Sequence, residues 1–143
     1  MDKALNYLAL ARKAGLAELG EEPVGVAAKA GNARLVLVAS DASDHTWRRA
    51  KSYVADSDQQ LLRMPYTKDE LGYAIGRTSL AIAAITDAGM AASLVAALEK
   101  PEQTVLNELQ EQAKRAQQRQ KERKAHEKNK RMGKKAVRPV KKN

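Results

Sequence analysis

Two clusters of ionisable residues in the first half of the chain have the residue types that catalysis uses. Glu21 and Glu22 stand side by side ahead of Pro23, at the predicted start of a helix. Paired carboxylates are the usual groups of general acid–base catalysis. Adjacent residues on a helix point in different directions, so these two carboxylates would not converge on one substrate atom. The pair therefore gives no support for catalysis.

The second cluster is Asp41, Ser43, Asp44 and His45, which contains the residue types of a Ser–His–Asp triad. It lies between a predicted strand and a predicted helix, where Asp and Ser side chains commonly accept hydrogen bonds from the N–H groups of the first helical turn. We interpret it as a helix cap. His45 and His126 are too far apart for a zinc site, and the chain has no cysteine, so no metal is expected.

The motifs that bind nucleotide cofactors are also absent from the sequence. There is no G-x-x-x-x-G-K-[ST] phosphate loop, and no G-x-G-x-x-G fingerprint follows a predicted strand. The sequence therefore predicts a protein that is not an enzyme and has no cofactor.

The elements that must position these residues follow from the spacing of the apolar side chains and from capping residues. Thr67 with Glu70 three residues later has the spacing of a capping box, and Gly31 is the expected C-terminal cap of the helix that contains Pro23. The predicted order is a helix over 5–15, an extended link over 16–19, a helix over 22–30, a strand over 34–40, a helix over 47–54, a strand over 60–64, a helix over 67–76, a strand over 80–86 and a helix over 88–100.

Strands that alternate with helices predict an α/β/α sandwich. The 143 residues are 43% hydrophobic but include no Phe, so the core must be built mainly from Ala, Leu, Val and Ile. No apolar run approaches the roughly 18 residues of a membrane span, and the N-terminus lacks the pattern of a signal peptide. We expect a monomeric cytoplasmic protein with no membrane partner.

The positive charge of the chain is confined to its C-terminal part. Residues 1–100 carry 12 Lys+Arg and 12 Asp+Glu, whereas residues 101–143 carry 14 Lys+Arg and 5 Asp+Glu, a net charge of +9. Pro101 marks the change, so we predict a domain over 1–100 and a basic extension over 101–143. Helix formers favour a helix from 102 to about 130, with Val105, Leu106 and Leu109 docking its first turns, and the last ten residues are predicted to be disordered.

The order of elements and three segments, GEEPVGVAAKAGNARLVLVASDAS, LGYAIGRTSLAIAAITD and GMAASLVAAL, resemble a known family. It is the ribosomal L7Ae/L30e family of kink-turn RNA binders, and specifically its bacterial YlxQ-like branch. The resemblance covers about residues 3–98. It implies a three-layer α/β/α sandwich with a mixed four-stranded sheet, and it implies binding of kinked RNA, usually without catalysis.

The resemblance also implies where the RNA would lie. In the family, a Gly-x-Asn-Glu-x-x-Lys motif at the start of the second helix faces sheared G·A pairs, and here Gly20 matches its glycine, while Glu22, Pro23 and Val26 fall on its asparagine, glutamate and lysine. Helix N–H groups favour phosphate, and a carboxylate accepts hydrogen bonds from exposed base donors. Such a helix start would select distorted RNA over plain duplex.

Pro23 and Val26 depart from this motif, because Pro23 brings neither a carboxylate nor an N–H, and Val26 cannot donate to guanine. The family's second contact, a loop before the last strand that packs on a flipped-out nucleotide, corresponds to residues 76–79. Arg77 and its neighbouring hydroxyls suit phosphate and 2′-OH contacts. The predicted RNA-binding residues of the domain are Gly20, Glu21, Glu22, Lys29, Arg77, Thr78 and Ser79.

The basic extension suits sequence-independent contact with phosphate through counterion release. The predicted phosphate contacts are Lys114, Arg115, Arg119, Lys121, Arg123 and Lys124. Three functions remain open: an RNA binder of ribosomal-protein type that recognises structured RNA such as a kink-turn; a general ribosome or rRNA binder held mainly by the extension; and an accessory recognition module for an RNA-modifying enzyme. The alternative role of residues 101–143 is only to keep the protein soluble, without binding RNA.

Overall fold

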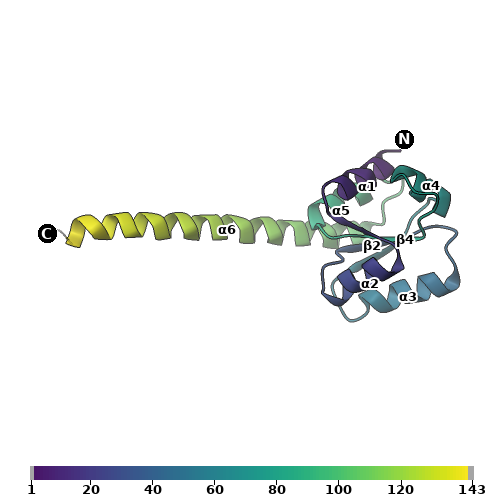
Figure 1. Ribbon diagram of the computed structural model, residues 1–143, viewed down its shortest axis with the longest axis horizontal. Helices are drawn as coiled ribbons and strands as arrows, with labels where there is room; N and C mark the ends of the chain where they lie inside the picture. The colour runs from purple at the N-terminus through teal and green to yellow at the C-terminus, as the bar shows by residue number, and fades with distance from the viewer. Residues whose placement is uncertain (1, 142–143) are drawn as a thin grey trace. The chain divides into compact units, whose positions relative to one another are not determined.

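The computed structural model describes the backbone of residues 2–141 and the side chains of residues 2–129. The chain divides into two compact units, Met1–Ala113 and Lys114–Asn143. The elements of the chain are α1 (Lys3–Lys13), β1 (Ala17–Leu19), α2 (Glu21–Lys29), β2 (Leu35–Val38), α3 (Asp44–Val54), β3 (Gln60–Arg63), α4 (Lys68–Ala74), β4 (Ile82–Ile85), α5 (Ala88–Ala96) and α6 (Gln103–Lys141), with α6 running through both units (Figure 1).

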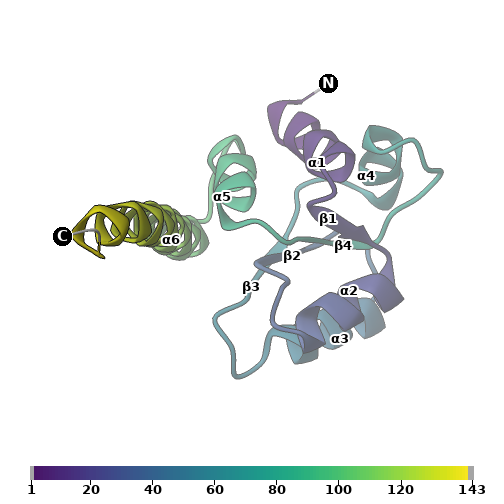
Figure 2. The ribbon, with the colours of Figure 1, turned by 60° about the vertical axis from the view of Figure 1, so that its left-hand side comes forward.

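The first unit contains one mixed four-stranded sheet with the strand order β1-β4-β2-β3. β2 pairs in parallel with β3, whereas β4 pairs antiparallel with both β1 and β2. Helices cover both faces, with α2 and α3 on one side and α1, α4 and α5 on the other (Figure 2). The predicted three-layer α/β/α sandwich is confirmed.

The side chains of β2 explain why the sheet needs helices on both faces. All four residues are buried, and alternate side chains enter different cores because successive residues of a strand point to opposite faces. Leu35 and Leu37 join the core under α1, α4 and α5, whereas Val36 and Val38 join the core under α2 and α3. A continuous apolar run is typical of a strand that is covered twice.

Most predicted elements are present, and the capping box of Thr67 and Glu70 is formed. The segment predicted as an extended link contains a strand, since Ala17, Glu18 and Leu19 pair with β4. α6 continues as far as Lys141, whereas the last ten residues were predicted to be disordered. Residues 142–143, the end of that prediction, lie outside the described residues.

The first turns of α6 belong to the folded body. Val105, Leu106 and Leu109 are buried in the core that also contains Leu8 and Leu94. The body thus extends past Pro101 to Ala113.

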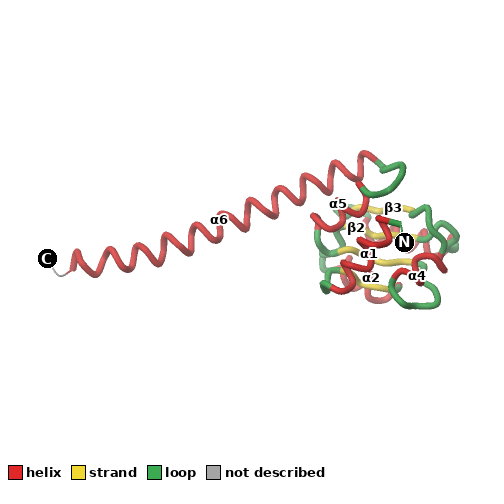
Figure 3. The backbone as a smooth tube through the Cα atoms, turned by 90° about the horizontal axis from the view of Figure 1, so that it is seen from above, coloured by secondary structure: helices red, strands yellow, loops and turns green. Residues whose placement is uncertain are grey.

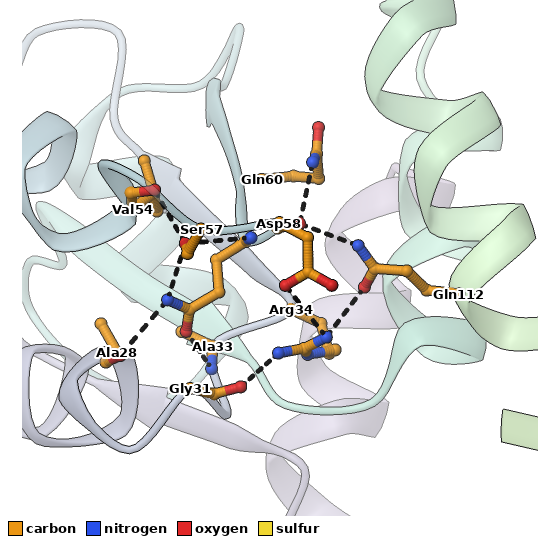
Figure 4. A network of polar contacts seen from close by, with 10 residues as sticks. Ala28, Gly31, Ala33, Arg34, Val54, Ser57, Asp58, Gln60 and Gln112 are labelled. Atoms are coloured by element: carbon orange, nitrogen blue, oxygen red, sulfur yellow. Dashed lines mark hydrogen bonds and ion pairs between the residues drawn. The ribbon is translucent and has the colours of Figure 1, made fainter. Parts of the chain in front are cut away.

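A network of polar contacts around Gln112 also holds the first turns of α6 against the body (Figure 4). The Gln112 side chain, 4% exposed, donates from Nε2 to the Asp58 carbonyl at 2.8 Å and accepts from Arg34 Nη1 at 3.1 Å. Arg34 Nη1 lies 3.7 Å from Asp58 Oδ1. A buried amide with both ends paired fixes the position of its helix, because an unpaired polar group in that place would be costly.

The second unit, residues 114–143, is a single stretch of helix in its described part (Figure 3). Every side chain from 114 to 129 is exposed. This unit carries 14 Lys+Arg and 2 Asp+Glu, a net charge of +12, whereas residues 1–113 carry 12 Lys+Arg and 15 Asp+Glu, a net charge of −3. Within residues 2–141, none of the helices is both long enough and apolar enough to cross a bilayer.

Candidate functional site

The start of α2 is built around Gly20. Its φ of +98° lies in a region that residues with a side chain rarely adopt. The Gly20 N–H donates to the Ile82 carbonyl of β4 at 3.0 Å, and no side chain caps the helix. Helix geometry provides no intrahelical acceptor for the N–H groups of the first turn. Pro23, in the same turn, has no N–H group. The N–H groups of Glu21 and Glu22 therefore remain for a ligand.

The two adjacent glutamates at this helix start have different surroundings. Glu21 Oε1 lies 2.6 Å from Nε of Arg49 on α3, and Arg49 also donates to the Tyr53 hydroxyl at 3.4 Å. The hydrogen bond with Tyr53 and the charge of Glu21 raise the pKa of the Arg49 guanidinium above its usual value. Glu21 is thus paired with a cation, whereas the described part of the chain shows no ion pair for Glu22. Sequence reasoning missed Arg49, because nothing local marks a partner on another helix.

Two open grooves run along the flanks of α2, and Glu22 and Val26 line both of them. One has a volume of about 770 Å³ and is also lined by Glu18, Ala30 and Thr86. The other has a volume of about 530 Å³ and includes Arg49 and Lys29. Val26 is 67% exposed between them. Lys29 lies at the far end of α2, roughly 12 Å along the axis from Glu21 at 1.5 Å per residue.

The loop over residues 76–79 is held close against α4. Arg77 N–H donates to the Gly72 carbonyl at 2.8 Å, while the four residues from Gly76 to Ser79 are exposed. A Cβ atom at Gly72 would lie 2.6 Å from the Ser79 backbone nitrogen and 2.9 Å from the Arg77 carbonyl oxygen. Gly72 is therefore required by the close approach of the loop backbone.

Replacement of Gly72 by Ala should destabilise the body. Alanine in a helix is favoured over glycine by up to about 1 kcal/mol, but the clash is with backbone atoms that cannot rotate away, and overpacking costs about 1–3 kcal/mol. We expect a net loss of about 1–2 kcal/mol in the free energy of unfolding, measured by urea denaturation.

Gly89→Ala is the matched control, because the nearest atom to its Cβ is Oδ2 of the Asp87 side chain at 3.3 Å, which caps α5 through the Met90 N–H and needs to shift by only a few tenths of an ångström. Its effect should be clearly smaller than that of Gly72→Ala. Equal effects of the two substitutions would contradict the packed position of the loop.

The sheet brings the start of α2 and this loop to the same end of the body. Leu19 pairs with Ala83, so the end of β1, which leads into α2, lies beside the beginning of β4, which follows the loop. Figure 2 shows the chain entering α2 and the chain leaving α4 at the same end of the sheet, although the two helices cover opposite faces. The predicted residues Gly20, Glu21, Glu22, Arg77, Thr78 and Ser79 thus come from one region, which we call the α2–loop surface.

The triad-like cluster has a structural role. Ser43 Oγ accepts from the Thr46 N–H at 3.1 Å and caps α3, as predicted. Asp41 Oδ1 accepts from the Lys68 N–H at 2.8 Å and ties this turn to α4. Across the part of the chain that the structure describes, no group of three or more His, Asp or Glu side chains could hold a metal ion.

The predicted phosphate contacts of the extension lie on α6. Lys114, Arg115, Arg119, Lys121, Arg123 and Lys124 all have exposed side chains. They follow the last buried residue of the body, Gln112, within the same helix.

Comparison with known proteins gives the family. No protein-family model matches the chain. The large ribosomal subunit protein eL8 of Haloquadratum walsbyi is 39% identical over 93 residues, which are 64% of this chain and 78% of that protein. The chain belongs to the L7Ae family. This membership fits the glycine and strand placement around α2 and β4.

Two solved structures agree with the L7Ae fold. A Bacillus halodurans protein of unknown function has 29% identity and a TM-score of 0.64, and the match covers 70% of this chain and all of that one. A Giardia lamblia 15.5kD RNA binding protein has 18% identity and a TM-score of 0.57, covering 70% of this chain and 85% of that one. The L7Ae assignment therefore rests on sequence, and these structures support its fold.

Proposed function

We propose that this chain is a non-catalytic RNA-binding protein of the L7Ae type that recognises structured RNA, including kink-turn RNA, and associates with the ribosome in the cytoplasm as a monomer. The observation that carries the proposal is the α2–loop surface, where open helix N–H groups, the Glu22 carboxylate and the Arg77 loop meet at one end of the sheet. The relative named as a ribosomal protein supports the ribosomal part.

The chemistry of this surface suits distorted RNA. Helix N–H groups can receive a phosphate, and Arg77 offers a charged donor beside two hydroxyls. The Glu22 carboxylate repels phosphate but accepts from base amino and imino groups, most of which are occupied by base pairing or lie in the deep major groove of a regular A-form duplex. Discrimination would therefore come from bases that a kink exposes.

A general binder held by the extension is the second candidate. It is favoured by the charges of the two units, −3 for the body and +12 for residues 114–143, and by Val26, whose exposed apolar side chain cannot form a hydrogen bond with a base. The two candidates differ in what the body adds to RNA affinity.

Arg77→Ala in the full chain separates them. Hydrogen bonds to charged groups contribute about 1.5–3 kcal/mol, so affinity for a kink-turn RNA should fall about tenfold or more, with a smaller loss for a straight duplex. Fluorescence anisotropy with both RNAs measures the two effects.

Arg12→Ala is the matched control for this experiment. Arg12 is an exposed arginine in the last turn of α1, which leads to the opposite end of β1. It should change either affinity less than about twofold. If Arg77→Ala behaves like Arg12→Ala and the wild-type chain binds both RNAs equally, the general binder is correct.

A further inference from the structure

In the exposed part of α6, the arginines lie on one face of the helix and the lysines lie on another. Successive residues of a helix are rotated by about 100°, so residues four apart lie on one face, and residues seven apart return to nearly the same direction. Three arginines at spacings of four form the arginine face: Arg115, Arg119 and Arg123. Four lysines form the lysine face: Lys114, Lys121, Lys124 and Lys128.

The mean directions of the two faces differ by about 180° around the helix axis at 100° per residue. The two carboxylates of this unit flank the arginine face, with Glu122 at the edge next to Arg115 and Glu127 at the edge next to Arg123, and Ala and Gln occupy much of the remaining surface. Glu122 is held along its own side by a hydrogen bond from Gln118 Nε2 at 3.1 Å. All of these side chains are exposed.

A helix with side chains is about 10–12 Å across, so a phosphate strand that lies along one face is out of reach of cations on the other. The carboxylates at the two edges of the arginine face repel a strand that would wrap around the helix. One RNA strand could therefore use only about half of these cations. This arrangement of cations suits two RNA phosphate backbones that lie on opposite sides of the helix.

We propose that residues 114–129 of α6 bridge two RNA segments, with one phosphate backbone on the arginine face and a second on the lysine face. The inference rests on the proposed RNA-binding function and goes beyond it, because the chain would bring two RNA segments together as well as hold one. The arginine face binds the more firmly held segment, since guanidinium groups form paired hydrogen bonds with phosphate, whereas lysines act as point charges.

The test is a capture experiment with the full-length chain. One short RNA duplex is immobilised, a second, fluorescent duplex is supplied in solution, and retention of protein and of the second duplex are measured separately. Wild-type protein should bind the immobilised duplex and retain the fluorescent one. Protein retention reports the proposed function, and fluorescence reports bridging.

Three triple variants with equal loss of charge identify the role of the faces. R115Q/R119Q/R123Q removes the arginine face, K121Q/K124Q/K128Q removes most of the lysine face, and R115Q/K121Q/K128Q leaves two cations on each face. Glutamine is a good helix former, and circular dichroism checks that α6 is retained. Each single-face variant should lose capture of the second duplex by at least about tenfold relative to the mixed variant, because each phosphate contact contributes close to one logarithmic unit at 0.1 M salt.

Each other outcome overturns the inference. Equal loss of capture in all three variants would mean that total charge, or association of two protein copies, joins the duplexes. Protein retention without capture of fluorescence in the wild type would leave the proposed function standing and remove the bridging role. Absence of protein retention would reject both.

Discussion

Cutting the chain after Ala113 should lower its affinity for RNA by about five orders of magnitude at 0.1 M salt, because the six predicted phosphate contacts each release about 0.9 counterion. The slope of log K against log salt concentration should become shallower by about 5 on duplex RNA. Affinities from fluorescence anisotropy over a salt series measure both. The cut removes no residue of the buried core, whose last members are Leu109 and Gln112.

The truncated body should keep its ratio of affinities for kinked and straight RNA, since that ratio depends on the α2–loop surface. A control in the full chain replaces Gln117 and Gln120 by Ala; both are exposed side chains of α6, and their loss should change affinity less than about twofold. If the body alone binds as tightly as the whole chain, the extension does not supply the affinity. A body that binds without preference would support the general binder.

Local signals in the sequence were sufficient for most elements of the fold. The capping box at Thr67 and Glu70, the continuous apolar run of β2 and the glycine before α2 each depend on neighbours within a few residues. β1 was missed as a strand because three residues carry too short a pattern to show alternation. Its partner β4 lies more than sixty positions away in the sequence.

The site was predictable in part for the same reason. The helix start at Gly20 and the loop at Arg77 carry local glycine signals, and the sheet brings them together. The ion pair between Glu21 and Arg49 is a contact between helices, and it changes which glutamate can contact a ligand. Neither partner has a sequence feature that marks the other. Arrangements of this kind depend on tertiary packing, which a single sequence does not reveal.

The C-terminal limit of the body is another product of tertiary packing. Pro101 and the change in composition suggested a boundary near residue 100, but an amphipathic turn that follows a proline can pack back onto the core. Gln112 shows how far this packing reaches, because its amide bridges Arg34 and the Asp58 carbonyl. The chemistry of the extension therefore begins at Lys114.

Leu109→Ala should destabilise the body by about 2–5 kcal/mol, the usual cost of a cavity at a fully buried leucine. Urea denaturation, followed by circular dichroism, measures the free energy of unfolding. Gln110→Ala is the matched control: its side chain is exposed on the next position of α6, and alanine is an excellent helix former, so the effect should be within about 0.5 kcal/mol.

Comparing Leu109→Ala with Gln110→Ala decides whether residues 101–113 belong to the folded body or to the basic extension. If these turns were part of a separate basic extension, both substitutions would leave the unfolding of the body unchanged, and a cut after Lys100 would give a stable domain. If they complete the core, Leu109→Ala alone weakens it, and the shorter fragment loses Val105, Leu106 and Leu109 together. That fragment would expose apolar side chains of the core that these three residues complete, so RNA binding by the body must be measured on residues 1–113.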